Sequence, residues 1–207
     1  MIQVITLSRA HGSGGHEIAR RVAESLGWGL VDRALIEEVA RLARIPPEEA
    51  EAFDERVDPW VVRLARGLWG GSAEAFAGPP QATVPHADLM ADLTRRAVLQ
   101  AAAAGRCVIL GRGAQCILAG RDDTLRVFVY APTEDRLRRL RPRYRDEAAA
   151  AAALVDVDRT RNAYVRRYYG CDRTDPGCYD LMINSRLGIE QVVRMILCVA
   201  GKGGETA

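Results

Sequence analysis

The sequence predicts an α/β domain with a parallel β-sheet, on three observations. An apolar run at residues 2–7 leads through a glycine-rich turn into a helical pattern, and short apolar runs then alternate with helical segments. Several of these runs end in polar, glycine-flanked residues. Strands separated by helices form parallel sheets with right-handed crossovers, and their ligand crevice lies at the carboxyl ends of the strands. The 207 residues suffice for one such domain with a substantial core.

The amino-terminal segment reads as strand, loop and helix. The strand at 2–7 runs into a glycine-rich loop that ends at Gly15, and Gly27 closes the helix that follows, as glycines commonly do. The apolar residues of this helix recur at helical spacing and are Ile18, Ala19, Val22, Ala23 and Leu26.

A short strand at 29–31 comes next, followed by a helix over 34–44 that two prolines stop. Residues 47–85 contain two short helical stretches and many glycines and prolines, which indicates an inserted segment, at about 46–86. This segment either covers a substrate or packs its aromatic side chains on the core, and the sequence leaves both readings open. Those aromatic side chains are Phe53, Trp60 and Trp69.

The second half of the chain continues the alternation. A helix is expected over 87–104, and the compact apolar runs at 106–110, 124–130 and 181–184 predict buried strands. Thr133 is expected to cap a helix that ends at Arg141, the alanine-rich run 148–153 predicts a long helix ending near Tyr169, and a closing helix contains residues 189–197. The residues from 201 onward are expected to form a flexible tail.

Composition narrows the classes of function. The net charge of +2 gives no electrostatic case for binding nucleic acid or membranes. The five cysteines are odd in number and irregularly spaced, which argues against a disulfide framework and against zinc, and we predict no metal site. The first residues show no leader pattern and no apolar run reaches membrane-spanning length, so we expect a cytoplasmic protein.

The most informative motif is the glycine-rich loop Gly12-Ser13-Gly14-Gly15 between the first strand and the first helix. Backbone N–H groups and the positive end of a helix dipole make such a turn a cradle for phosphate. A standard phosphate loop ends in Gly-Lys-Ser/Thr, whereas this chain has Gly15 and His16 at the last two positions. The only lysine of the chain is Lys202, so any cation here must be an arginine. The alternative is a tight turn that binds nothing.

Two further strand ends carry charged residues. Arg112 lies between two glycines, where a planar guanidinium can hold a phosphate through two hydrogen bonds, or form a structural ion pair instead. Asp32 follows the strand at 29–31, where it can bind a substrate hydroxyl or metal-bound water, or can simply cap a helix.

The carboxyl-terminal half is rich in arginine. The run from Arg136 to Arg145 reads mostly as a solvated basic face. At about 100° per residue, Arg159 and Arg166 share one helix face, while Arg161 lies nearly opposite Arg159 and beside Asp158. Only part of this group can face one cleft, and surface ion pairs are the alternative for the rest.

These groups suit phosphoryl transfer. That reaction needs positioning and positive charge on the moving group rather than covalent chemistry by the protein, with magnesium supplied from solution. The three histidines and scattered cysteines disfavour a nucleophilic triad or a metallohydrolase.

The ordered set of motifs resembles the cytidylate-kinase-like family, a branch of the P-loop nucleoside monophosphate kinases. The matching stretches are Ile5 to Arg9 with Gly12 to Gly15, Val31-Asp32, Ile109 to Gly113, Phe128 to Pro132, Asp158-Arg159, and Tyr179 to Asn184. The resemblance covers nearly the whole chain to residue 200. It implies a P-loop NTPase-type three-layer fold with a five-stranded parallel sheet and helices on both faces, formed by a single domain over 1–200. It also implies a helical acceptor-binding insertion, a lid at about 136–175 and a tail at 201–207.

The resemblance implies roles for individual residues. Gly12, Ser13, Gly14, Gly15 and the amides of His16 and Glu17 would hold the phosphates of ATP. Asp32, Arg33, Arg112 and Asp158 would bind the acceptor nucleotide. Arg112, Arg159 and Arg161 would supply charge for transfer, and Arg9 would substitute for the missing lysine. ATP and Mg²⁺ are the implied cofactors.

The chain departs from true members of the family at Gly15, His16 and Leu110, where they have lysine, serine or threonine, and an acidic residue. We therefore expect an ATP-dependent kinase of a small acceptor, CMP or dCMP first, with small-molecule nucleotides as partners. A nucleotide-binding sensor without turnover and a kinase of a non-nucleotide acceptor are the alternatives.

Overall fold

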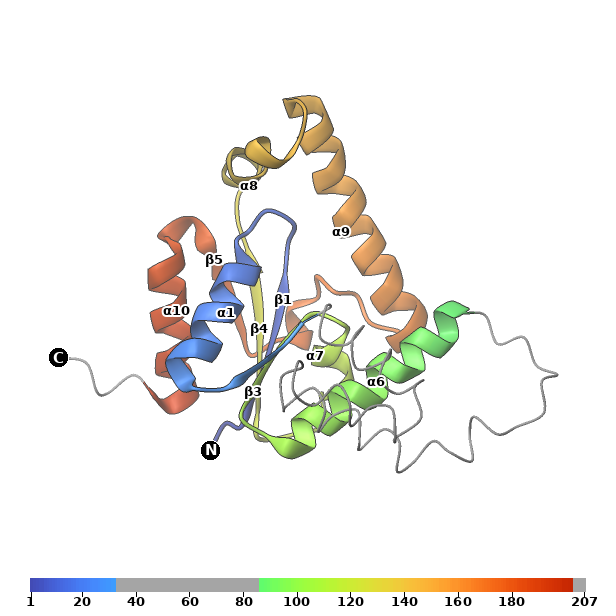
Figure 1. Cartoon of the computed structure of the whole chain (residues 1–207), viewed down its shortest axis with the longest axis vertical. Helices are drawn as coiled ribbons and strands as arrows, with labels where there is room; N and C mark the ends of the chain where they lie inside the picture. Colours follow the sequence, from blue (N-terminus) through green and yellow to red (C-terminus); the bar gives the residue numbers. More distant parts are fainter. Residues whose placement is uncertain (33–85, 203–207) are drawn as a thin grey trace, which may run out of the picture. The chain divides into compact units, whose positions relative to one another are not determined.

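The computed structural model describes residues 1–32 and 86–202 (Figure 1). It divides into two compact units, Met1–Leu30 with Arg106–Ala207, and Val31–Gly105. The predicted helix over 34–44 and the inserted segment, with its three aromatic anchors, lie outside the described residues. A single domain over 1–200 therefore stays a prediction.

The structure contains a five-stranded parallel sheet, which confirms the predicted fold class. Its strands are β1 (Val4–Arg9), β2 (Gly29–Val31), β3 (Cys107–Leu110), β4 (Thr124–Tyr130) and β5 (Leu181–Asn184). Their order is β2-β3-β1-β4-β5, so β1 lies at the centre between β3 and β4. β1 extends two residues beyond the predicted strand and so includes Arg9, which pairs with Val129 of β4.

Helices cover both faces of this sheet. α1 (Gly15–Leu26) and α10 (Ile189–Leu197) pack against one face, where Ile5 and Leu7 of β1 are fully buried (Figure 1). Because side chains alternate along a strand, Ser8 points to the opposite face. There its hydroxyl donates a hydrogen bond of 3.1 Å to Gln115 of the short helix α7 (Ala114–Ile117). Three layers result, as the resemblance implied.

The second unit contains the described helix α6 (His86–Ala104), which confirms the helix predicted over 87–104. One side of α6 is buried at Leu93, Ala97, Val98 and Ala101. Asp32 belongs to this unit as well.

Two helices follow β4 in the first unit. α8 (Thr133–Leu140) continues through a turn of 3₁₀ helix (Arg141–Arg143), and α9 (Glu147–Tyr169) runs to Gly170, whose φ of +67° ends it as predicted. The expected cap at Thr133 is wrong, because Pro132 holds the extended cap position and Thr133 is already helical. Asp146 caps α9 by accepting a hydrogen bond from the Ala149 N–H. Within the described ranges, no helix has the length and apolar composition needed to cross a bilayer.

Candidate functional site

The loop that joins β1 to α1 depends on two glycines in left-handed backbone conformations. Gly12 has φ of +77° and Gly14 has φ of +79°. A Cβ atom on Gly12 would lie 2.9 Å from the Arg136 carbonyl oxygen, and one on Gly14 would lie 2.6 Å from Ile189 Cδ1. Conformation and space therefore both select glycine here. The loop ends at the first turn of α1, where N–H groups have no partner within the helix.

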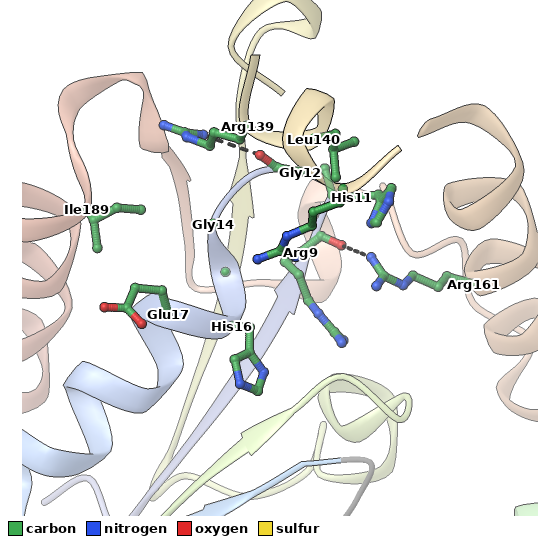
Figure 2. A pocket seen from close by; sticks show the side chains of 13 residues that line it. Arg9, His11, Gly12, Gly14, His16, Glu17, Arg139, Leu140, Arg161 and Ile189 are labelled. Carbon is green, nitrogen blue, oxygen red and sulfur yellow. Dashed lines mark hydrogen bonds between the residues drawn. The ribbon is translucent and has the colours of Figure 1, made fainter. Parts of the chain in front are cut away.

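A pocket of about 640 Å³ opens at this loop (Figure 2). Four of its lining residues are arginines, and Glu17 is the only acidic one among the described residues. Hydrogen bonds from Arg20 and Arg21 lower the pKa of Glu17 to about 2, so its carboxylate is ionised and already bonded to these two arginines. The lining residues are Arg9, Ala10, His11, Gly12, Gly14, Gly15, His16, Glu17, Arg139, Leu140, Arg143, Arg161 and Ile189. The pocket is therefore electropositive and suits an anion.

Four arginines bind the carbonyl oxygens of the loop. Arg136 Nε donates to the His11 carbonyl at 2.6 Å and Arg139 Nη1 to the Gly12 carbonyl at 3.5 Å. The Arg9 carbonyl accepts from Arg161 at 3.3 Å and from Arg173 at 2.8 Å (the Arg161 bond is drawn in Figure 2). These bonds fix the loop through its carbonyl groups.

Asp158 of α9 lies at the centre of this group of arginines. Its Oδ1 accepts hydrogen bonds from the His11 N–H at 2.9 Å and from Arg173 at 3.1 Å, and its Oδ2 accepts one from Arg136. Arg161 is 3.8 Å from the same Oδ1. Both carboxylate oxygens are thus engaged with the loop and its arginines. The acceptor-binding role implied by the resemblance stays a prediction, and in this structure Asp158 connects α9 to the loop.

The reading of residues 136–145 as a solvated face is wrong for Arg136 and Arg139, whereas Arg143 is exposed as predicted. The Arg136 side chain is only 12% exposed, and Arg139 and Arg143 line the pocket. These three positions are spaced i, i+3 and i+7, the spacing of one helix face. Arg138, by contrast, is 72% exposed and pairs with Asp135. This spacing is present in the sequence, but arginine is so common in the chain that its arginine clusters were read as surface residues.

Ser13, predicted among the phosphate-binding residues, has a fully buried side chain that stabilises the loop itself. Its hydroxyl donates to the Ala10 carbonyl at 2.8 Å, and its carbonyl accepts from Ser185 Oγ at 2.6 Å. Arg139 donates to both oxygens of Ser185. The end of β5 thereby supports the loop after β1.

The turn after β3 has three successive residues in the left-handed region: Gly111 at φ +77°, Arg112 at +62° and Gly113 at +69°. A positive φ is unusual for a residue with a side chain and often marks a functional site. A Cβ atom on Gly111 would overlap Arg9 Nη1, and one on Gly113 would overlap the Tyr169 ring. Glycine at these two positions therefore permits the turn conformation and also leaves space for the side chains of Arg9 and Tyr169.

Arg9 places a positive charge between this turn and the loop after β1. Burial lowers the pKa of the Arg9 guanidinium to about 9, and the charges of Arg161 and Arg112 act in the same direction. The carboxylate of Asp158 opposes this effect. Clustered arginines with little compensating negative charge favour binding of an anion.

The other predicted site residues are less central. Arg159 does not line the pocket; its side chain is 75% exposed and pairs with Asp156 at 2.8 Å. This agrees with the helical spacing, which placed Arg161 and Arg159 on nearly opposite faces. Asp32 belongs to the second unit, and Arg33 lies outside the described residues.

Sequence reasoning missed Arg173. This side chain is 7% exposed, binds the Arg9 carbonyl and Asp158, and lies over the Phe128 ring at 5.5 Å from its centroid. It stands in an irregular segment after α9, where no periodicity marks a buried position. Only the tertiary contacts identify it.

The described residues offer no preformed cluster of protein ligands for a metal ion. They contain no group of three histidine, cysteine or acidic side chains placed to hold a metal ion. Mg²⁺ prefers oxygen ligands, whereas His16 offers a ring nitrogen and the Glu17 carboxylate is hydrogen-bonded to arginines. Mg²⁺ bound at this pocket would therefore take most of its ligands from water and phosphate oxygens.

Comparisons with known proteins agree with this architecture. An uncharacterized protein from Eubacterium ventriosum has a similar structure, with a TM-score of 0.66 and 20% identity, over 97% of this chain and 99% of that one. Shikimate kinase from Bacteroides thetaiotaomicron gives a TM-score of 0.52 at 16% identity, over 97% and 99% of the two chains. These likenesses show the fold, which is that of the P-loop kinases.

Two comparisons rest on sequence. A cytidylate kinase from Methanosarcina mazei is 28% identical over 103 residues, and the match spans 49% of this chain and 56% of that protein. The model of the cytidylate kinase-like family matches residues 4–187. The chain therefore belongs to the cytidylate kinase-like family.

Proposed function

We propose that the protein transfers the γ-phosphoryl group of ATP to a small acceptor, with a nucleoside monophosphate such as CMP or dCMP as the first candidate. The electropositive pocket at the start of α1 carries the proposal. It combines a loop shaped by Gly12 and Gly14 with four lining arginines, at the carboxyl edge of the sheet. Membership of a kinase-like family and the P-loop kinase fold support the same reaction.

The proposed roles follow from position. The N–H groups of Gly14 to Glu17 stand at the start of α1 and would bind the phosphates of ATP. Arg161 lines the pocket and would balance the charge of the transferred group. Arg112, at the end of the neighbouring strand β3, would bind the acceptor phosphate.

The test is a turnover assay with ATP and MgCl₂ against a panel of nucleoside monophosphates and non-nucleotide alcohols, following formation of ADP. We expect turnover with CMP or dCMP and a large loss in Arg112→Met. Arg121→Met is the control, because Arg121 pairs with Asp123 ahead of β4, at the amino edge of the sheet.

Calorimetry with ATP and ADP separates the alternatives. Binding without turnover of any acceptor would favour a nucleotide sensor, and turnover of a non-nucleotide alone would favour a different kinase. Absence of nucleotide binding would contradict the proposal and the sensor together.

A further inference from the structure

The loop after β1 differs from a standard phosphate loop not only at Gly15 and His16 but also at the position of the motif's first glycine. The pattern Gly-x-x-x-x-Gly-Lys-Ser/Thr, aligned so that Gly14 is its second glycine, places its lysine at Gly15 and its first glycine at Arg9. The chain therefore has a cation where the motif has glycine, and glycine where the motif has the cation. The sequence alone does not show whether these two changes are connected.

The structure connects them through contact. A Cβ atom on Gly15 would lie 2.5 Å from Arg9 Cβ and 2.8 Å from Arg9 Cγ. The stem of Arg9 thus fills the space through which a side chain from position 15 would leave the helix. A lysine at 15 and an arginine at 9 exclude one another, because real Cβ atoms do not approach neighbours so closely.

The guanidinium of Arg9 reaches the adjacent strand end. Its Nη1 occupies the space that a Cβ atom on Gly111 would take, so the side chain extends from the start of α1 to the turn after β3. In Figure 2 the Arg9 carbonyl faces Arg161, whereas the side chain extends to the side of the loop where His16 lies. The charge stands between the proposed sites of the ATP phosphates and of the acceptor.

This guanidinium has no protein anion as partner among the described residues. Its backbone carbonyl accepts hydrogen bonds from Arg161 and Arg173, but no described carboxylate or carbonyl accepts one from its side chain. Asp158, the nearby carboxylate, is engaged by the His11 N–H, Arg136 and Arg173. A partly buried cation with other arginines around it is stabilised when an anion binds.

We propose that Arg9 is the catalytic cation of this loop, taking the place of the phosphate-loop lysine, and that Gly15 is glycine because the Arg9 stem occupies its side-chain space. The inference rests on the proposed phosphoryl transfer. In that step an acceptor oxygen forms a bond to the γ-phosphorus, the bond from that phosphorus to the β,γ-bridging oxygen breaks, and ADP leaves with the electron pair. Arg9 stabilises the negative charge on these oxygens.

The experiment is an exchange of the two residues. Four proteins are compared: wild type, Arg9→Gly, Gly15→Lys, and the double variant, which restores the first glycine and the lysine of the standard motif and keeps His16. We expect Arg9→Gly to lower kcat by about 100-fold or more, as loss of a charge-stabilising donor does elsewhere. Gly15→Lys alone should lower both kcat and Tm, because the new side chain meets the Arg9 stem. The double variant should regain at least about tenfold in kcat over Arg9→Gly and a Tm close to that of wild type.

Equilibrium binding gives a second readout that does not need turnover. Arg9→Gly should weaken an ATP analogue with a non-hydrolysable β–γ bond by about tenfold while leaving ADP within about threefold, and the double variant should restore the ratio. Arg121→Met should match wild type throughout. A wild type that binds ATP but turns over no acceptor refutes the proposed transfer, and with it the catalytic role of Arg9. An active wild type whose Arg9→Gly variant keeps its kcat and its preference for ATP overturns this inference alone, and so does a folded double variant no better than Arg9→Gly.

Discussion

The arginines around the loop after β1 have different bonding partners on its two sides. On one side, Arg136, Arg139 and Arg173 donate to loop carbonyls, and Asp158 pairs with Arg136 and Arg173. On the other side, the Arg9 side chain lies against Gly15 with no carboxylate bound to it among the described residues. Arginines that look alike in the sequence therefore have two roles in the structure. One set stabilises the loop, and the Arg9 side chain is available to bind a ligand.

Asp158→Asn gives the largest expected effect on stability. The substitution keeps the shape and an acceptor for the His11 N–H but removes the charge that faces Arg136, Arg161 and Arg173. Removing one partner from such a group leaves buried like charges, and we expect a loss of about 3 kcal/mol in the free energy of unfolding. Urea denaturation measures it.

Asp156→Asn is the matched control, two residues earlier on α9. Asp156 pairs with the exposed Arg159, so the loss should stay below about 0.5 kcal/mol. Equal losses in the two variants would show that the carboxylate of Asp158 has no special place among the arginines.

Arg136→Met and Arg138→Met compare two arginines of α8. Arg136 is buried and bonded to the His11 carbonyl and Asp158, and its loss should destabilise the protein by about 2 kcal/mol. Arg138 is mostly exposed with a single ion pair, and its loss should cost less than about 0.5 kcal/mol. Thermal and urea unfolding of the pair provide the measurement. A similar loss from both would restore the solvated-face reading of this segment.

The sequence predicted the fold well because its signals are local. Gly27 ends α1 as predicted, and the strand at 124–130 has the predicted bounds. The site was predicted less completely. The position of Arg173 depends on contacts between segments far apart in the chain. The contact of Arg9 with Gly15 depends on the direction of one side chain. Neither feature leaves a periodic pattern in the sequence.

Gly111→Ala tests the ligand side of the loop. A left-handed φ costs a residue with a Cβ atom about 1 kcal/mol, and the added methyl group would also displace the Arg9 guanidinium. Gly170→Ala is the control, since Gly170 has φ of +67° but open space around its Cβ position. We expect similar losses of stability, with weakened binding of the ATP analogue only in Gly111→Ala. Unchanged binding in both would argue that the position of Arg9 does not matter to the ligand.

The smallest expected effect is that of Glu17 on the stability of the protein at acidic pH. Arg20 and Arg21 lower the pKa of Glu17 in the folded protein to about 2, whereas an unfolded glutamate titrates near about 4.3. The unfolded chain therefore binds a proton first as the pH falls, so the stabilisation by Glu17 is complete above about pH 5 and is lost progressively toward pH 2. The decrease in Tm between pH 5 and pH 2 should be slightly smaller in Glu17→Gln than in wild type. Only the backbone N–H of Glu17 is proposed to meet the ligand, and its carboxylate is bonded to Arg20 and Arg21. Glu17→Gln should therefore leave the ratio of ATP-analogue to ADP affinity unchanged, and a shift in that ratio would show that the side chain takes part in binding as well.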